Sequence, residues 1–287
     1  MIIEKKILIN GLGIFTKRMG SGIPILFLHG GPGGEHRYFL PHLDGLSDTF
    51  ELIFYDQRGC GQSDEDTNQN YSIDKEIETL EELRLSLGLD KLNIVGESWG
   101  SMLALLYASK YPTHVNKLFL TAAVGATEEG YLKFGELLED RLTPEDKERL
   151  EQLQIQYREG KIAVSEIFKV IDPYYLYSPD NVVKKTKTKS NAEVNRILGT
   201  EIINKYSINL KLDVLSKVPI MIAQGDHDII TPTHLEDLML RHLPHTKLKV
   251  IENCGHWTVI EKPLQLCKLI REYFAGFPKE KDLTHSV

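Results

Sequence analysis

The sequence repeatedly follows a short apolar run with a longer segment that has the spacing of an amphipathic helix. Strands buried on both faces that alternate with helices are typical of a parallel sheet covered by helices. The sequence therefore predicts an α/β fold with a mostly parallel, doubly wound sheet, and residues 2–19 predict an antiparallel hairpin at its edge. The expected strands cover residues 23–30, 51–56, 91–98, 116–123, 218–226 and 246–253, and the expected helices cover 73–89, 101–111, 233–243 and 263–274.

The alternation stops between residues 128 and 215, where the sequence becomes helical. Thr143 has the features of an N-cap and Pro144 those of a first-turn residue. We expect a core domain formed by residues 1–127 and 216–287, with 128–215 inserted as a helical cap. Insertions at this point lie over the carboxyl ends of the strands, where ligands bind in open α/β sheets. The lysine-rich run at 184–189 is interpreted as a solvated loop.

The charge and the apolar runs of the chain argue against nucleic acid and membranes as partners. Lys and Arg number 34 against 41 Asp and Glu, and the resulting net charge of −7 disfavours binding to nucleic acid. No apolar run reaches the length of a membrane span, and the first twenty residues lack the features of a secretory signal. Cys60, Cys254 and Cys267 are widely spaced, which favours a reducing compartment over a disulfide framework. We expect a cytoplasmic protein that binds neither nucleic acid nor membranes.

The most specific local motif is Gly96-Glu97-Ser98-Trp99-Gly100, which lies between an expected strand and an expected helix. A nucleophile elbow requires this context, because the sharp turn forces the nucleophile into a strained conformation and needs small residues beside it. The motif therefore predicts that Ser98 is a nucleophile above the edge of the sheet.

A serine hydroxyl needs a neighbouring base and a carboxylate that orients the base. His256 follows the strand expected at 246–253, and Asp228 lies in the loop after the strand at 218–226. The chain order Ser, Asp, His is the order used with this elbow. Asp226 is a competing acid, but it stands directly at the strand end, so Asp228 is preferred.

Acyl transfer also needs hydrogen-bond donors for the oxyanion. The loop at 29–34 (HGGPGG) can offer one backbone N–H group, and Trp99 can offer the other. A phosphate-binding role for this loop is disfavoured because no Lys-Ser/Thr pair follows and GxGxxG is absent. His29 is interpreted as a packing or loop-fixing residue. No metal-binding spacing is found, so we expect neither a metal nor another cofactor.

The motifs at 29–34 (HGGPGG), 54–64 (FYDQRGCGQSD), 96–101 (GESWGS), 225–232 (GDHDIITP) and 254–257 (CGHW) together resemble the proline iminopeptidase family of α/β-hydrolases. The resemblance implies the α/β-hydrolase fold with a helical cap, and an aminopeptidase that releases N-terminal proline or another residue from small peptides. It implies Ser98, Asp228 and His256 as the catalytic triad, and Gly31 and Trp99 as the oxyanion donors.

The resemblance also implies acidic residues that bind the free amino group of the substrate, because a buried ammonium needs opposite charge. The candidates here are Glu201 and Asp226, with Glu193 behind them. The sequence departs from the family pattern at Glu97, where glycine is usual, and in the cap. Three functions stay open: a prolyl-type aminopeptidase, an esterase or carbon–carbon bond hydrolase with the same triad, and a non-catalytic receptor. The complete set of catalytic groups disfavours the receptor.

Overall fold

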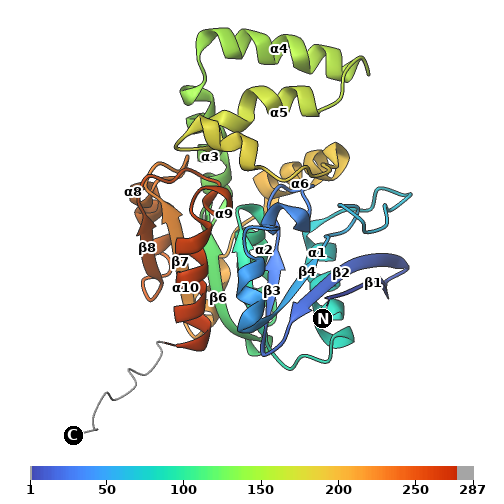
Figure 1. Ribbon diagram of the computed structural model, residues 1–287, viewed down its shortest axis with the longest axis vertical. Coiled ribbons are helices and arrows are strands. Elements are labelled where there is room, and N and C mark those ends of the chain that lie inside the picture. The colour runs from blue at the N-terminus through green and yellow to red at the C-terminus, as the bar shows by residue number, and fades with distance from the viewer. Residues whose placement is uncertain (1, 277–287) are drawn as a thin grey trace, which may run out of the picture.

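The computed structural model describes residues 2–276, and within them the centre of the molecule is one eight-stranded sheet (Figure 1). The strand order is β1-β2-β4-β3-β5-β6-β7-β8. β1 and β2 form an antiparallel hairpin that joins β4 antiparallel, whereas the remaining neighbours are parallel. The predicted sheet and its edge hairpin are therefore confirmed. The strands are β1 (Ile2–Ile9), β2 (Leu12–Gly20), β3 (Ile23–Leu28), β4 (Phe50–Tyr55), β5 (Leu92–Glu97), β6 (Val115–Thr121), β7 (Ile220–Gly225) and β8 (Lys247–Ile251).

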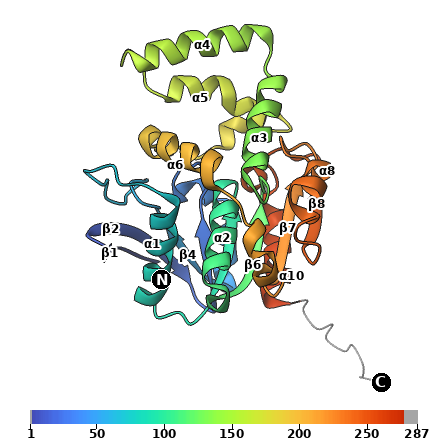
Figure 2. The same cartoon turned by 180° about the vertical axis from the view of Figure 1, so that it is seen from behind.

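Helices cover both faces of the sheet. α1 (Ile73–Ser86) and α2 (Trp99–Lys110) lie on one face, which Figure 2 shows in front, and α10 (Pro263–Ala275) lies on the other. The short helices α8 (Pro232–Leu235) and α9 (Thr258–Glu261) follow β7 and β8. Among the described residues, no helix combines the length and the apolar composition needed to cross a bilayer.

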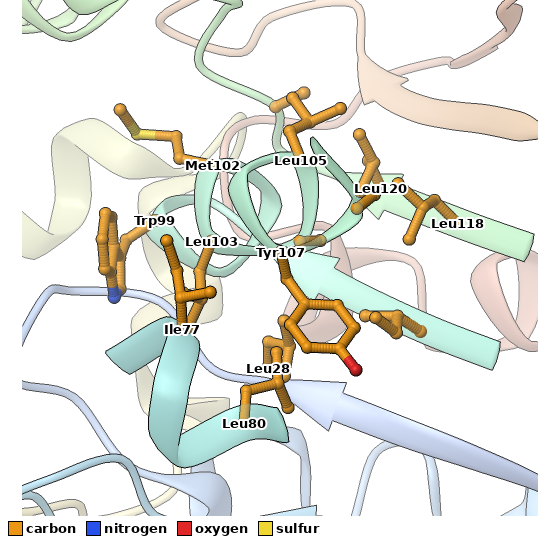
Figure 3. Close-up of a cluster of buried hydrophobic side chains, with 14 of the residues drawn as sticks. Leu28, Ile77, Leu80, Trp99, Met102, Leu103, Leu105, Tyr107, Leu118 and Leu120 are labelled. Carbon is orange, nitrogen blue, oxygen red and sulfur yellow. The ribbon is translucent and has the colours of Figure 1, made fainter. Parts of the chain in front are cut away.

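Successive side chains of each central strand point to opposite faces of the sheet, so each strand contributes to two hydrophobic cores. In β3, Leu26 and Leu28 pack with α1 and α2, while Ile25 and Phe27 pack with α10. Figure 3 shows Leu28 between α2, where Tyr107 lies beside it, and Leu80 of α1. Burial of one such side chain contributes about 1.5–3 kcal/mol, so both faces hold the strands in place. The carboxyl ends of the strands are thereby fixed as a rigid edge for loops.

Two expectations are corrected at the far side of the sheet. β8 was expected to be buried on both faces, but Lys247 and Lys249 are exposed because β8 is an edge strand. The helix expected at 233–243 is divided into α8 and a π-helical turn at Glu236–Leu240. The carbonyl group of Leu238 accepts a hydrogen bond from the N–H group of Ala126. In a regular α-helix the carbonyl group of Leu238 would accept a hydrogen bond from the N–H group four residues later, so its bond to Ala126 interrupts the regular hydrogen-bond pattern.

Between β6 and β7 the chain forms helices that lie at one end of the molecule (Figure 1). Thr143 caps α4 by accepting a hydrogen bond from the N–H group of Asp146, and Pro144 is in the first turn, as the sequence predicts. The two chain segments that lead into and out of this region pair through Thr127 and Ser207. The helices are α3 (Glu128–Arg141), α4 (Pro144–Arg158), α5 (Ser165–Ile171), α6 (Ala192–Lys205) and α7 (Leu212–Leu215).

Candidate active site

Ser98 occupies the turn that joins β5 to α2. β5 ends at Glu97 and α2 begins at Trp99, so Ser98 is the single residue between them. Its backbone has φ 52° and ψ −120°, a combination that residues other than glycine rarely adopt. The turn puts Ser98 at the carboxyl end of the sheet, where it lines a cavity.

Two glycines make this turn sterically possible. A Cβ atom on Gly100 would lie 2.1 Å from the carbonyl oxygen of Leu28, at the end of β3. A Cβ atom on Gly96 would lie 2.5 Å from the carbonyl oxygen of Gly100. Both obstacles are backbone atoms, which cannot rotate away as a side chain can. The glycines on either side of Ser98 are therefore required by the approach of α2 to the sheet.

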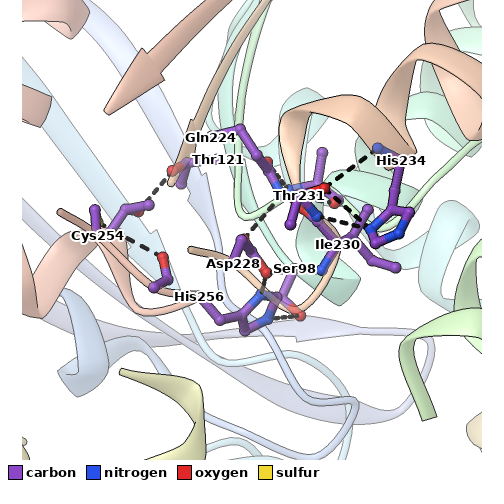
Figure 4. Close-up of polar contacts among 12 residues, drawn as sticks. Ser98, Thr121, Gln224, Asp228, Ile230, Thr231, His234, Cys254 and His256 are labelled. Atoms are coloured by element: carbon purple, nitrogen blue, oxygen red, sulfur yellow. Dashed lines mark hydrogen bonds and ion pairs between the residues drawn. The ribbon is translucent and has the colours of Figure 1, made fainter. Parts of the chain in front are cut away.

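Ser98, His256 and Asp228 form one hydrogen-bonded chain (Figure 4). Nε2 of His256 lies 3.0 Å from Oγ of Ser98, and Nδ1 of His256 lies 2.8 Å from Oδ1 of Asp228. When Nδ1–H donates to Asp228, Nε2 is left to accept the proton of the serine hydroxyl. The structure thus brings together the three residues that the sequence singled out for this role.

Gln224 supports the carboxylate of Asp228 and was not identified from the sequence. Its Nε2 donates to Oδ2 of Asp228 at 2.8 Å, while the N–H group of Ile230 donates to Oδ1 at 3.2 Å. Gln224 is fully buried at the end of β7. A polar residue within the apolar run IMIAQG was the signal that could have revealed it. These bonds fix the orientation of the Asp228 carboxylate, so that its Oδ1 faces His256.

The surroundings of His256 act on its pKa in opposite directions. Burial has the largest effect and lowers the pKa, whereas the charge and hydrogen bond of Asp228 and the charge of Glu97 raise it. The net result is a pKa above the ordinary value of 6.5. Because a base must be neutral to accept a proton, His256 is available for this role only at a pH above its raised pKa.

The glycine-rich loop at 29–34 lies beside the elbow. Gly31 and Trp99 both line the cavity together with Ser98. Gly31 has φ 126°, which favours glycine, and a Cβ atom there would lie 2.7 Å from the backbone nitrogen atoms of Gly33 and Gly34. Trp99 is the first residue of α2, so its N–H group has no acceptor within the helix. Both backbone donors expected from the sequence are therefore next to Ser98.

His29 holds this loop in place. Its Nε2 accepts a hydrogen bond from the N–H group of Gln57 at 3.1 Å, and its carbonyl oxygen accepts one from the Gln57 side chain at 2.9 Å. Gln57 in turn accepts a hydrogen bond from Nε1 of Trp99 at 2.8 Å. Burial lowers the pKa of His29, which keeps Nε2 an acceptor. Gln57 therefore connects the glycine-rich loop to Trp99 at the start of α2.

One cluster has the composition of a metal site. The ligand atoms of Glu35, His36 and Asp56 lie within 4.8 Å of one another and are buried. Protein donors already engage the two carboxylates: Glu35 pairs with Arg37, and Asp56 accepts hydrogen bonds from the N–H group and from Nδ1 of His36. The cluster therefore fits a structural role for the loops that carry it.

A cavity of about 400 Å³ opens above Ser98. One wall comes from the elbow and the glycine-rich loop, and the opposite wall comes from the helices between β6 and β7. Aromatic side chains dominate the second wall, and Phe134 and Tyr175 also pack against the ring of His256. From that second wall the lining residues include Tyr131, Phe134, Phe168, Asp172, Tyr175, Lys185 and Asn195.

Two of the acidic residues expected to bind a substrate amine lie outside this cavity. Glu201 uses one carboxylate oxygen to accept a hydrogen bond from the N–H group of Ile73 at 2.7 Å, and the other to pair with Lys205 at 2.5 Å. It thus ties α6 to the start of α1. Glu193 pairs with Arg196 on the surface at 2.6 Å. Their helical positions turn both carboxylates away from Ser98.

Asp226, the third expected binding residue, is also absent from the cavity lining. Its carboxylate accepts hydrogen bonds from the N–H groups of Asn253 and Cys254 at 2.9 and 3.0 Å. Burial raises the pKa of Asp226, but the hydrogen bond with His227 and these two backbone bonds outweigh it and lower the pKa to about 2. Asp226 therefore fastens the loop after β7 to the loop that carries His256.

The acidic side chains that do line the cavity are Glu35, Glu97 and Asp172. Glu97 was noted in the sequence only as a departure from a family pattern. Asp172 pairs with Lys185 at 2.5 Å, and the Lys185 ammonium lies 4.6 Å from the ring centre of Trp257. The interpretation of the lysine-rich run as a solvated loop is thus wrong for Lys185, because the aromatic wall and Asp172 draw it inward.

Comparison with known proteins agrees with this geometry. Residues 23–263 match the family model described as alpha/beta hydrolase fold. The proline iminopeptidase of Lactobacillus crispatus (strain ST1) is 27% identical, over 95% of this chain and 98% of that protein. Two solved structures have a TM-score of 0.71. They are a thermophilic esterase from Thermogutta terrifontis (20% identity, 96% of this chain, 98% of that one) and 2-hydroxy-6-oxo-6-phenylhexa-2,4-dienoate hydrolase from Rhodococcus sp. strain RHA1 (23%, 96% and 99%).

The structural neighbours support the fold alone, while the curated relative confirms the resemblance to proline iminopeptidases that the motifs indicate. The family model spans the strands from β3 to β8, the elbow and the loops that carry Asp228 and His256. The chain therefore belongs to the α/β-hydrolase fold family.

Proposed function

We propose that this protein is a serine hydrolase in which Ser98 attacks a carbonyl carbon, His256 takes its proton and Asp228 orients His256. The observation that supports this most strongly is the hydrogen-bonded chain of these three residues at the floor of the cavity. His256 would return the proton to the leaving group, and water would then release the acyl group from Ser98 by the same route.

The N–H groups of Gly31 and Trp99 would stabilise the oxyanion. Both residues lie beside Ser98, and the N-terminal end of α2 adds the partial positive charge of a helix dipole. Loss of one such donor costs about 3–4 kcal/mol of transition-state stabilisation. The hydrogen bonds among His29, Gln57 and Trp99 support this role because they hold both donors in one arrangement.

The substrate would be a small peptide or aminoacyl compound with a free amino terminus, and the reaction an aminopeptidase cleavage. The proline iminopeptidase relatives support this choice. A carboxylesterase or carbon–carbon bond hydrolase is the second candidate, because the solved structures that share the fold include an esterase and a dienoate hydrolase. An aminopeptidase must bind the ammonium group of its substrate on the acyl side of the cavity, whereas an esterase or carbon–carbon bond hydrolase needs no such site.

Residues 128–215 would act as a cap domain on a core of residues 1–127 and 216–287. The paired segments at Thr127 and Ser207 support this division, since the region joins the core at one place. The cap would contribute the aromatic wall of the cavity and exclude water from the acyl-enzyme. A cytoplasmic location remains part of the proposal and is supported by the free thiols of Cys60, Cys254 and Cys267.

Labelling with a fluorophosphonate probe tests the mechanism. The wild-type protein is expected to take up one probe per chain at Ser98, and Ser98→Ala is expected to take up none and to lose hydrolysis. A folded wild-type protein that is not labelled would contradict the proposal. Aminoacyl-arylamides, their N-acetylated forms and simple aryl esters, assayed side by side, then separate the aminopeptidase from the esterase.

A further inference from the structure

The charge state of the cavity is set by its three carboxylates. Glu35 pairs with Arg37, and Asp172 pairs with Lys185, so each has a cation beside it. Among the described residues, no lysine or arginine pairs with Glu97. Glu97 is therefore the cavity carboxylate that has no lysine or arginine partner among the described residues.

The position of Glu97 is immediately beside the candidate nucleophile. It precedes Ser98 in the chain, and its Oε2 lies against the glycine-rich loop. A Cβ atom built on Gly30 would lie 2.2 Å from Oε2 of Glu97 and 3.2 Å from Cβ of Ser98. The Glu97 carboxylate and the carbon that carries the nucleophilic oxygen thus both lie against Gly30.

The hydroxyl group of Tyr38 faces the same carboxylate. It is close enough for the charge of Glu97 to raise the pKa of Tyr38, in addition to the larger effect of burial. A hydrogen bond from Tyr38 to the Glu97 carboxylate raises the pKa of Tyr38 further. The geometry of this bond lies outside the normal range, and Oη of Tyr38 is buried without another partner among residues 2–276. Tyr38 also lines the cavity. The phenol oxygen of Tyr38 and the carboxylate of Glu97, which has no cationic partner, therefore face each other in the cavity.

Burial makes this arrangement costly without a cation. Glu97 is only 4% exposed, and burial, the largest effect, raises its pKa to about 7 despite the opposing charge of His256. A carboxylate removed from water needs a cation or hydrogen-bond donors to remain ionised. An ammonium group that enters from the cavity would supply both.

We propose that Glu97 and Tyr38 form a subsite for the α-ammonium group of the acyl half of the substrate, so that the substrate class is aminoacyl esters and amides with an unblocked amine. The inference rests on the proposed serine hydrolase mechanism. In such substrates the amine nitrogen is two bonds from the carbonyl carbon, which itself must lie about 3–3.5 Å from Oγ of Ser98 to react. A carboxylate next to Ser98 is therefore within reach of that nitrogen.

The family pattern named above has glycine at this position, which carries no charge, so the role would be a departure from that pattern. Glu97 is a binding residue in this scheme and takes no part in proton transfer. The ion pair would form at a carboxylate that is only 4% exposed, where a charge-assisted hydrogen bond is stronger than at the surface. The acidic residues first expected to bind the amine lie outside the cavity, and Glu97 replaces them.

A matched pair of esters tests the subsite. L-Alanine 4-nitrophenyl ester carries an ammonium group where isobutyric acid 4-nitrophenyl ester carries a methyl group, and the two are otherwise the same shape. In Glu97→Gln, kcat/KM for the alanyl ester is expected to fall about ten- to a hundredfold, while kcat/KM for the isobutyryl ester stays within about threefold of wild type. Asp172→Asn, which alters a cavity carboxylate that already has a cation, is expected to change both esters alike.

Isopropylammonium chloride gives a second measurement that needs no aminoacyl substrate. It is expected to slow fluorophosphonate labelling of wild-type Ser98 but not of Glu97→Gln, and Glu97→Asp, which keeps the charge, is expected to retain part of this protection. An unchanged alanyl-to-isobutyryl ratio in Glu97→Gln, or an equal loss on both esters, would overturn the subsite and leave the hydrolase proposal standing. Wild-type protein that neither hydrolyses an ester nor reacts with the probe would overturn both.

Discussion

The carboxylate of Glu97 fills the space that a side chain on Gly30 would need. A Cβ atom on Gly30 would lie 2.2 Å from Oε2 of Glu97, far inside van der Waals contact. A residue larger than glycine in the loop after β3 would therefore require the Glu97 side chain at the end of β5 to move. The substrate side of the cavity is shaped by this contact between two neighbouring strands.

Substitution of Gly30 by alanine is expected to be harmful only while Glu97 is present. Gly30→Ala should lower the free energy of unfolding by about 1–3 kcal/mol through overpacking. In a Glu97→Gly background most of that loss should disappear, because Cβ of Ser98 at 3.2 Å is the next obstacle. Urea denaturation of the four proteins in this double-mutant cycle measures the coupling. Equal losses in both backgrounds would show that the strain arises in the loop backbone.

Asp228 and Asp226 are expected to fail in different ways. Asp228→Asn should reduce kcat by about four orders of magnitude with little change in stability, because the tautomer of His256 is no longer controlled. Asp226→Asn should mainly reduce stability, by about 1–3 kcal/mol, since two loop N–H groups, one of them partly buried, lose a charged acceptor. Steady-state kinetics and thermal unfolding of both variants check this. A large loss of kcat with unchanged stability in Asp226→Asn would reverse the assignment.

The acidic limb of the pH profile is expected to depend on Glu97. The carboxylates of Asp228 and Glu97 stabilise the imidazolium form of His256 and, against the effect of burial, raise its pKa above 6.5. Since the base must be neutral, kcat/KM should rise as the pH passes that raised pKa. Glu97→Gln should therefore move the acidic limb to lower pH, by less than the loss of a full charge would, because Glu97 itself has a pKa of about 7. Hydrolysis of the neutral isobutyryl ester between pH 5 and 9 measures the shift, and a limb that moves upward or not at all would contradict it.

Glu76 is expected to weaken the fold as the pH rises. Neither of its buried carboxylate oxygen atoms accepts a hydrogen bond of normal geometry from the described residues, and burial, partly opposed by Arg58, raises its pKa from 4.5 to about 8. A group whose pKa is raised on folding stabilises the protein below the unfolded pKa, and this contribution is lost as the pH rises through the folded pKa. For Glu76 the loss covers pH 4.5 to 8 and amounts to several kcal/mol, at about 1.4 kcal/mol per pKa unit.

Glu76→Gln should remove this pH dependence. The stability of the variant relative to wild type is therefore expected to increase between pH 5 and pH 8.5 in urea denaturation. Isobutyryl ester hydrolysis serves as the control for an intact site, because Glu76 lies on α1, outside the cavity lining. A stability difference that is constant across this range would show that Glu76 stays ionised or solvated in the native state.

The sequence by itself determined the elements of the sheet and the residues of the hydrogen-bonded chain. Short, continuous apolar runs specify the strands locally. Gly96 and Gly100 around Ser98 specify the elbow, because the turn itself requires small residues. Asp228 and His256 could be selected because each follows a strand, and parallel strands end at the same edge of the sheet. These inferences need only local spacing and strand order.

Only the tertiary structure decided which acidic residues face the cavity. Glu201, Glu193 and Asp226 are turned toward Lys205, Arg196 and the loop after β8, because the packing of α6 and of the two loops fixes their directions. Glu97 faces Gly30 and Tyr38, which are distant from it in sequence. Folding decides whether a carboxylate lies beside a cation that balances its charge. The spacing of residues along the chain does not reveal the neighbours of Glu97, because they are distant in sequence.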